Sequence, residues 1–131
     1  MWDQGQAFAV ETVDVTTWDD FAEQYNLVGN VTMMKIDVEG WESFVLEGGA
    51  QTLLRADAPV LQVEFSDENA QKTGVSCARL YKQLTDLGYE MFVYNEKLNE
   101  LRPSRLRDYY DYVNLFAIKR IADVQFRLQG R

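Results

Sequence analysis

The chain has 131 residues, 47% of them hydrophobic, a length that suits one globular domain with a single core. Its 21 acidic and 13 basic residues give a net charge of -8, which argues against nucleic acid as a partner because phosphates are bound by clustered Lys and Arg. One cysteine and no histidine exclude an internal disulfide, the usual zinc ligand sets and catalysis by a histidine base, which leaves carboxylates, Lys, Tyr or water for proton transfer.

The first third of the chain predicts a strand, a helix and a second strand. Residues 8–15 alternate in the manner of a half-exposed strand. The hydroxyls at 16–17 can cap a helix over 18–25, whose first turn is acidic. Residues 31–36 are apolar on both faces apart from Lys35, which predicts a strand covered on both sides, as in a parallel sheet.

The middle of the chain predicts a helix followed by a second buried strand. Four residues recur at the spacing of an amphipathic helix, and we expect them to face the core: Trp41, Phe44, Val45 and Gly48. Residues 50–55 continue as a further turn or two. Pro59 then opens an apolar run over 60–65, which predicts a strand that ends in a carboxylate.

A third helix is predicted after a polar loop over 66–75. Ser76 is a suitable N-cap, and Gly88 stands where a residue with positive φ ends many helices. Cys77 lies on the apolar face of this helix, so we expect a core thiol rather than a nucleophile.

The last part of the chain predicts two strands joined by a long connection. Residues 89–94 form the first strand and 95–111 a polar connection. Residues 112–118 are apolar on both faces, so the last strand is predicted to be internal to the sheet. Residues 120–131 are predicted to form a tail, which is either a helix, from the loose helical spacing of its apolar residues, or frayed.

Strands and helices alternate, which predicts an α/β fold with a mostly parallel sheet and an antiparallel last strand. We divide the single expected domain into three parts: a lead-in strand and helix over 1–30, an α/β core over 31–119 and the tail over 120–131. No apolar run reaches the roughly 18 residues of a membrane span, and the first residues lack a signal-peptide pattern. We therefore expect no membrane partner and a cytoplasmic location.

Carboxylates end both predicted buried strands. Asp37 and Glu64 should lie on neighbouring strands, which are about 4.8 Å apart, and there they could share a cation, a substrate hydroxyl or a proton. Glu39 begins the next helix and either contacts a ligand or stabilises the helix dipole. Trp41 either walls a pocket near Asp37 or belongs to the core, and Lys35 is expected to pair with a carboxylate. We assign no metal, although a metal-binding or acid/base pair in a hydrolase stays open.

Four segments together resemble the carboxyl-terminal half of the FkbM family of S-adenosylmethionine-dependent methyltransferases. They are residues 17–20, 34–42, 45–50 and 59–64. The specific part is the sequence Lys-Ile-Asp-Val-Glu-Gly with its Leu-x-Gly-Gly-Ala partner. The resemblance covers about residues 10–65 by motif and extends to Lys119 by the order of the elements.

The resemblance implies a partial class I methyltransferase sheet of the Rossmann-like type, with S-adenosylmethionine as cofactor. It implies that Asp37 and Glu64 are catalytic, with Asp37 orienting or deprotonating the acceptor. It also implies that Asp37 and Glu39 contact the cofactor, and that Glu39 and Trp41 contact the substrate. Members of the family typically methylate hydroxyls of small molecules or sugars, so a small-molecule acceptor is the implied partner.

The sequence departs from the family in one respect. The glycine-rich half that binds the cofactor should precede Thr17. Among the sixteen residues before Thr17, Gly5 is the only glycine. We therefore expect a fragment that is inactive by itself. Residues 31–38 would then form a bare sheet edge that self-associates or binds a partner chain. The alternative is a noncatalytic α/β interaction module that assembles through this edge.

Overall fold

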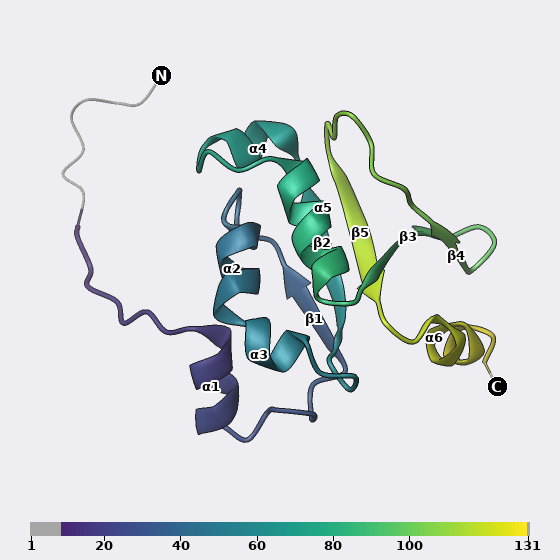
Figure 1. The fold of residues 1–131 in the computed structure, drawn as a ribbon, viewed down its shortest axis with the longest axis horizontal. Coiled ribbons are helices and arrows are strands. Elements are labelled where there is room, and N and C mark those ends of the chain that lie inside the picture. Colours follow the sequence, from purple (N-terminus) through teal and green to yellow (C-terminus); the bar gives the residue numbers. More distant parts are fainter. Residues whose placement is uncertain (1–8, 131) are drawn as a thin grey trace.

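A computed structural model describes residues 9–130, whose strands form one mixed sheet (Figure 1). From one edge to the other the five strands are β1 (Met33–Ile36), β2 (Val60–Phe65), β5 (Val113–Ile118), β3 (Glu90–Asn95) and β4 (Glu100–Pro103). Only β1 and β2 pair in parallel, and the other three pairs are antiparallel. The predicted α/β class is confirmed, but the prediction of a mostly parallel sheet is wrong.

Two features make the sheet more antiparallel than expected. The strand β5 lies between β2 and β3 and runs antiparallel to both, which confirms the prediction of an internal, antiparallel last strand. Residues 95–111, predicted as a connection, contain β4, which forms a hairpin with β3. The turn of this hairpin is possible because Asn99 takes a φ of 48°, in the left-handed region that Asn tolerates well.

Six helices connect or flank these strands within residues 9–130. They are α1 (Trp18–Gln24), α2 (Glu42–Gly48), α3 (Ala50–Leu53), α4 (Asp67–Gln71), α5 (Cys77–Asp86) and α6 (Ile121–Leu128). The predicted caps of α1 and α5 are confirmed, because Thr17 and Ser76 each accept a hydrogen bond from a backbone N–H of the first turn. Gly88 has the expected positive φ, 91°. None of these helices is both long enough and apolar enough to cross a membrane.

Two predictions of local structure are wrong, and one alternative is decided. Residues 9–17 form no strand and are mostly exposed, with Val10 at 93%, while Phe8 lies outside the described residues. The loop over 66–75 contains α4, because the Ser66 hydroxyl accepts a hydrogen bond from the N–H of Asn69 and caps a turn. Of the two alternatives for the tail, the helix is observed as α6, whose apolar side chains pack against a small cluster on the sheet.

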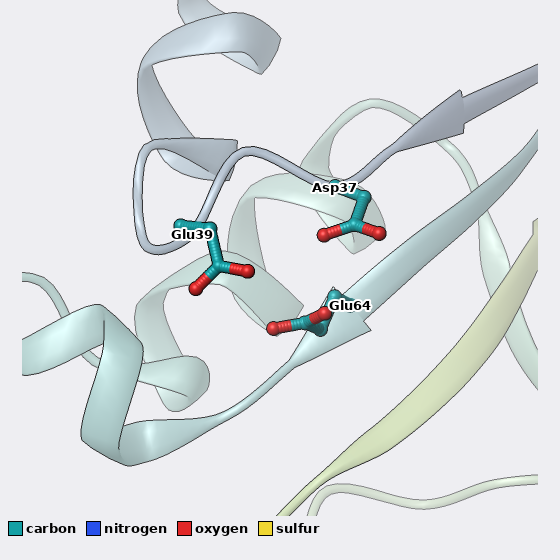
Figure 2. A group of neighbouring side chains, drawn as sticks. All are labelled: Asp37, Glu39 and Glu64. Carbon is teal, nitrogen blue, oxygen red and sulfur yellow. The ribbon is translucent and has the colours of Figure 1, made fainter.

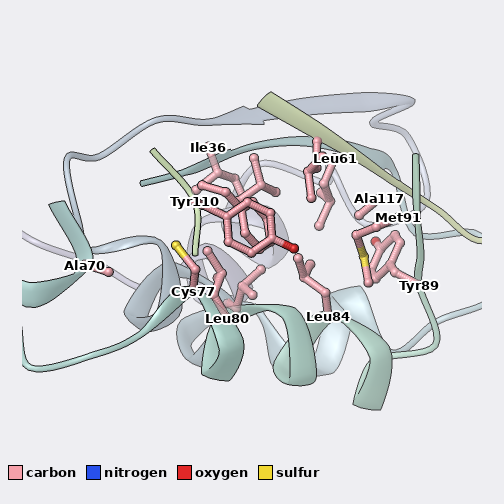
Figure 3. Packing of buried hydrophobic residues seen from close by; sticks show 14 of the residues in the cluster. Ile36, Leu61, Ala70, Cys77, Leu80, Leu84, Tyr89, Met91, Tyr110 and Ala117 are labelled. Atoms are coloured by element: carbon pink, nitrogen blue, oxygen red, sulfur yellow. The ribbon is translucent and has the colours of Figure 1, made fainter. Parts of the chain in front are cut away.

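One face of the sheet carries the main core. Side chains from α2, α3 and α5 meet β2 and β5 there, as Figure 3 shows for Leu80 and Leu84 of α5 below Leu61 of β2. Cys77 is buried in this cluster, as expected, and burial raises the pKa of its thiol to about 12, which leaves no nucleophilic thiolate at neutral pH. On the opposite face α6 covers a smaller cluster around Ile118.

β1 is covered on one face only. Ile36 is buried in the core, whereas Met33 is 50% exposed and Lys35 also points to solvent. The prediction of a strand covered on both sides is therefore wrong. The reason is that β1 is an edge strand among the described residues, and the apolar cluster under α6 contains residues of the other four strands but none of β1.

The orientation of α2 also differs from the prediction. Leu46 is buried in the core together with Glu42 and Ser43, while Trp41 and Phe44 are exposed and stack on each other at 5.1 Å between ring centroids. The apolar spacing therefore predicted the helix, and Val45 packs against the core as expected, but Trp41 and Phe44 do not. The turn before α2 decides the outcome, because it sets the angle at which the helix meets the sheet.

Candidate functional site

Register places two carboxylates side by side at the end of the parallel pair. Ile36 of β1 is opposite Val63 of β2, so Asp37 and Glu64 occupy the next position of each strand. Since side chains alternate along a strand, both point away from the core that holds Ile36 and Val63. The predicted proximity of Asp37 and Glu64 is confirmed.

Glu39 joins these two residues. One carboxylate oxygen from each of Asp37, Glu39 and Glu64 lies within 4.8 Å of the others (Figure 2). Glu64 is 5% exposed, whereas the side chains of Asp37 and Glu39 are 33% and 71% exposed. We call these three residues the carboxylate cluster. It has a buried floor and an open, acidic mouth.

The environment shifts the pKa values of two members of the cluster in opposite directions. Lys35 Nζ lies 3.0 Å from Asp37 Oδ2 and, by hydrogen bonding and charge, holds the pKa of Asp37 below its ordinary value. Burial raises the pKa of Glu64, and this effect exceeds the opposite one of the hydrogen bond that Asn69 donates to it. Two adjacent carboxylates with divergent pKa values are typical of acid/base sites.

A sharp turn between β1 and α2 carries Asp37 and Glu39. Glu39 and Gly40 have φ values of 55° and 103°, in the left-handed region that favours glycine. The buried carboxylate of Glu42 accepts hydrogen bonds from the N–H of Val38 at 3.1 Å and from the N–H of Gly40 at 3.1 and 3.3 Å. Glu42 was not among the predicted site residues. Its signal was a carboxylate just after a glycine turn, within reach of the free N–H groups at a helix start.

The short helix α4 forms the second wall of the site. Asn69 donates a hydrogen bond to Glu64 Oε1 at 2.9 Å and accepts one from Lys72 at 2.7 Å. The Thr73 hydroxyl donates to the carbonyl of Gly40 at 2.8 Å. A Cβ at Gly40 would lie 2.2 Å from the carbonyl oxygen of Asn69, so only glycine fits there. Residues 66–75 were predicted to be a loop, so Asn69 was not among the predicted site residues.

Trp41 lies apart from the carboxylate cluster. Its ring stacks on Phe44 and lines a hollow with residues 15–18, and no member of the cluster lines that hollow. The structure therefore brings together Asp37, Glu39 and Glu64, but not Trp41.

The chemistry of the cluster suits a cation or a hydroxyl group. Carboxylate oxygens bind divalent and organic cations, and they accept hydrogen bonds from hydroxyls. The geometry offers three oxygens on one side of a bound group, so a metal ion or an organic cation would need further ligands from solvent or from substrate. The site can therefore orient a polar group and take up a proton.

The fold is that of an α/β domain with carboxylates at its strand ends, and comparison with protein families shows to which family it belongs. The model of the methyltransferase FkbM domain matches residues 3–91, which is more than half of the chain and includes every residue of the carboxylate cluster. The chain therefore belongs to the FkbM methyltransferase family, which confirms the resemblance seen in the sequence. The comparisons with curated proteins and with solved structures give no match.

Proposed function

We propose that this domain takes part in methyl transfer from S-adenosylmethionine to a hydroxyl of a small molecule or a sugar. Membership of the FkbM family supports methyl transfer, and the carboxylate cluster is the observation that supports a hydroxyl acceptor. Carboxylates aimed at one point can accept the hydrogen bond of a hydroxyl and then its proton.

The residues of the cluster fit the cofactor in part. S-adenosylmethionine supplies an electrophilic methyl group on a positively charged sulfur, and it also carries an ammonium group and ribose hydroxyls. Asp37 and Glu39, which are both partly exposed, offer acceptors and negative charge for these groups. We assign cofactor contacts to these two residues.

We divide the acceptor chemistry between the two catalytic carboxylates by their pKa values. Asp37, with its lowered pKa, is a weak base, so its role is to orient the acceptor hydroxyl by accepting its hydrogen bond. Glu64, with its raised pKa, is the stronger base and would take the proton of the acceptor hydroxyl when the methyl group passes from the sulfur of S-adenosylmethionine to the acceptor oxygen. Glu39 contacts the acceptor at the mouth of the site, and Trp41 remains a predicted substrate contact.

We also propose that the described sheet is the carboxyl-terminal half of a class I methyltransferase sheet and that the 131 residues are inactive alone. The position of β5, antiparallel between β2 and β3, supports the first statement. The second is supported by residues 1–16, which contain no Gly-x-Gly loop.

Nuclear magnetic resonance with S-adenosylmethionine tests the proposal on the chain as it stands. We expect weak, millimolar binding with signal changes confined to residues 37–40 and Glu64, and weaker binding in Asp37→Asn. Asp57→Asn is the matched control, because Asp57 is an exposed, ion-paired aspartate that lies outside the cluster. Signal changes that avoid the cluster would refute the cofactor site. Micromolar binding by the chain alone would instead refute the statement that it is inactive by itself for lack of a cofactor half.

A second candidate function is that of an interaction module. The observation that favours it is the outer edge of β1, which has no strand partner within residues 9–130, together with the exposed side chain of Met33. We propose that this edge self-associates or binds a partner chain. Loss of cofactor binding in Asp37→Asn without any loss of assembly would separate the two functions.

A further inference from the structure

Glu42 is a buried carboxylate whose hydrogen-bond partners are backbone groups. Glu42 is 5% exposed, and its carboxylate accepts hydrogen bonds from the N–H groups of Val38 and Gly40. A charge in this position is costly unless it is satisfied by such donors. Two backbone donors on one carboxylate give Glu42 a specific structural task.

That task concerns the turn that carries Asp37 and Glu39. Val38 lies between these two residues, and Gly40 follows them, so the carboxylate of Glu42 ties down the backbone on both sides of Glu39. Glu39 has a φ of 55°, a conformation that L residues other than Asn, Asp and Gly rarely adopt without support. The hydrogen bonds from Val38 and Gly40 to Glu42 provide this support.

A second set of contacts holds the same turn from the side of α4. Thr73 donates to the carbonyl of Gly40, and the absence of a Cβ at Gly40 lets the carbonyl of Asn69 approach. These contacts fix the end of the turn, but they do not reach Val38. The backbone before Asp37 is held by the pairing of Ile36 with Val63, and the carbonyl of Val38 accepts a hydrogen bond from the N–H of Trp41 at 3.3 Å. The side chains that act on the same stretch are Glu42, which binds the N–H of Val38, and Lys35, which pairs with Asp37.

We propose that Glu42 is the positioning residue of the carboxylate cluster: it holds the turn over residues 37–40 and thereby aims Asp37 and Glu39 at Glu64. Glu42 itself lies outside the group of three that share the site. The proposal concerns the geometry of the cluster, so it stands or falls independently of the methyl transfer proposed above.

The first test uses the unaltered protein. In a pH titration followed by nuclear magnetic resonance, we expect the amide protons of Val38 and Gly40 to move upfield as the Glu42 carboxylate takes up a proton, which the chemical shift of its carboxyl carbon reports, because a neutral carboxyl accepts a weaker hydrogen bond. The internal control is the amide of Val45 in α2, which donates a hydrogen bond to the carbonyl of Trp41 and not to Glu42. Amides at Val38 and Gly40 that do not follow Glu42 would overturn the proposal.

The second test uses two substitutions, Glu42→Gln and Glu42→Asp. We expect amide exchange at Val38 and Gly40 to rise about tenfold or more in Glu42→Gln, which loses a charge-assisted bond. We also expect the pKa of Asp37 to rise towards its ordinary value, because a released turn moves Asp37 away from Lys35. Loss of a negative charge alone would lower that pKa, so a rise reports displacement.

The two substitutions and one control distinguish the effect of the negative charge of Glu42 from the effect of its side-chain length. Glu42→Asp keeps the charge but shortens the side chain, and it should raise the pKa of Asp37 as Glu42→Gln does. Glu47→Gln, in the same helix but exposed and paired with Arg79, should change neither the amides nor Asp37. Folded variants of Glu42 with unchanged exchange at Val38 and Gly40 and an unchanged pKa of Asp37 would overturn the proposal, and the titration of the unaltered protein decides if both variants fail to fold.

Discussion

Asp37 and Glu64 are both carboxylates at the ends of neighbouring strands, yet their surroundings act on them in opposite ways. Asp37 has a cation beside it and water around it, whereas Glu64 is buried and faces a second negative charge. The ionised form of Glu64 is therefore disfavoured in the folded protein. A residue kept for chemistry at the expense of stability is common at functional sites.

We expect Glu64→Gln to be more stable than the unaltered protein at neutral pH. The pKa of Glu64 is raised in the folded state, so its contribution to stability is present below the ordinary carboxyl pKa of about 4.3 and is lost as pH rises through the folded value. Gln keeps an oxygen for Asn69 and brings no charge into the site. Urea denaturation should show similar stabilities in acid and a growing advantage of the variant towards neutral pH. A stability difference that does not change with pH would contradict this prediction.

Gly40 should tolerate no side chain. In Gly40→Ala the new Cβ meets the carbonyl oxygen of Asn69, and φ is 103°, so we expect a loss of about 2–5 kcal/mol in the free energy of unfolding. Gly74→Ala is the matched control, because Gly74 also has a positive φ, 72°, but nothing lies within 4 Å of its added Cβ. Its loss should be only about 1–2 kcal/mol, from the backbone conformation alone. Equal losses in both variants would mean that the approach of Asn69 does not matter.

At the scale of elements, the site lies where the turn before α2 meets α4. The helix α4 is short and held in place largely by one side chain, Asp67. Its carboxylate accepts hydrogen bonds from the N–H of Cys77 at 3.1 Å and of Tyr110 at 2.8 Å, and its own N–H donates to the carbonyl of Tyr110. Asp67 thus joins α4 to α5 and to the segment that leads into β5.

Asp67→Asn should loosen this junction. Asn offers one oxygen where Asp offers two, so one charge-assisted bond is lost, and we expect a decrease of about 1.5–3 kcal/mol in the free energy of unfolding. Urea denaturation measures this change. The exposed neighbour supplies the control, because Glu68→Gln should stay within about 0.5 kcal/mol of the unaltered protein. A similar small change in Asp67→Asn would show that α4 is held by other contacts.

At the scale of the whole molecule, the two faces and two edges of the sheet are unequal. The core face carries α2, α3 and α5, while the other face is covered by α6 near Ile118 and leaves Met33 exposed. Trp41 and Phe44 form a second exposed apolar pair. Exposed apolar surface beside an open strand edge favours association.

We expect the chain to form dimers whose proportion rises with protein concentration and with salt, since salt screens the repulsion between chains of net charge -8. Met33→Lys should weaken the dimer, because a lysine on an edge strand opposes strand pairing. Leu98→Lys, which alters an exposed leucine at the β3–β4 turn, is the control and should leave the dimer intact. Size-exclusion chromatography with light scattering measures the mass. A monomer at high concentration and high salt would contradict association of the chain with itself.

Local patterns in the sequence determined much of this protein. The buried run of 60–65, the capped helix that begins at Cys77 and the family motif around Asp37 depend on short-range preferences, which are written in neighbouring residues. The pairing of Asp37 with Glu64 was also predictable, because parallel strands joined by one crossover bring their carboxyl ends together.

Only the tertiary structure decided which side of α2 is buried, that α4 exists, and that Glu42 and Asn69 belong to the site. Each depends on contacts between segments that are distant in the sequence or on the direction in which a turn releases the chain, as at Gly40. The stretch from Lys35 to Glu42 shows both contributions. Its sequence motif identified the family and supplied the carboxylates of Asp37 and Glu39, whereas the backbone conformation at Glu39 and the hydrogen bonds to Glu42 determine where these two carboxylates point. The type of a residue is a local property, whereas the direction of its side chain depends on all the segments against which the turn packs.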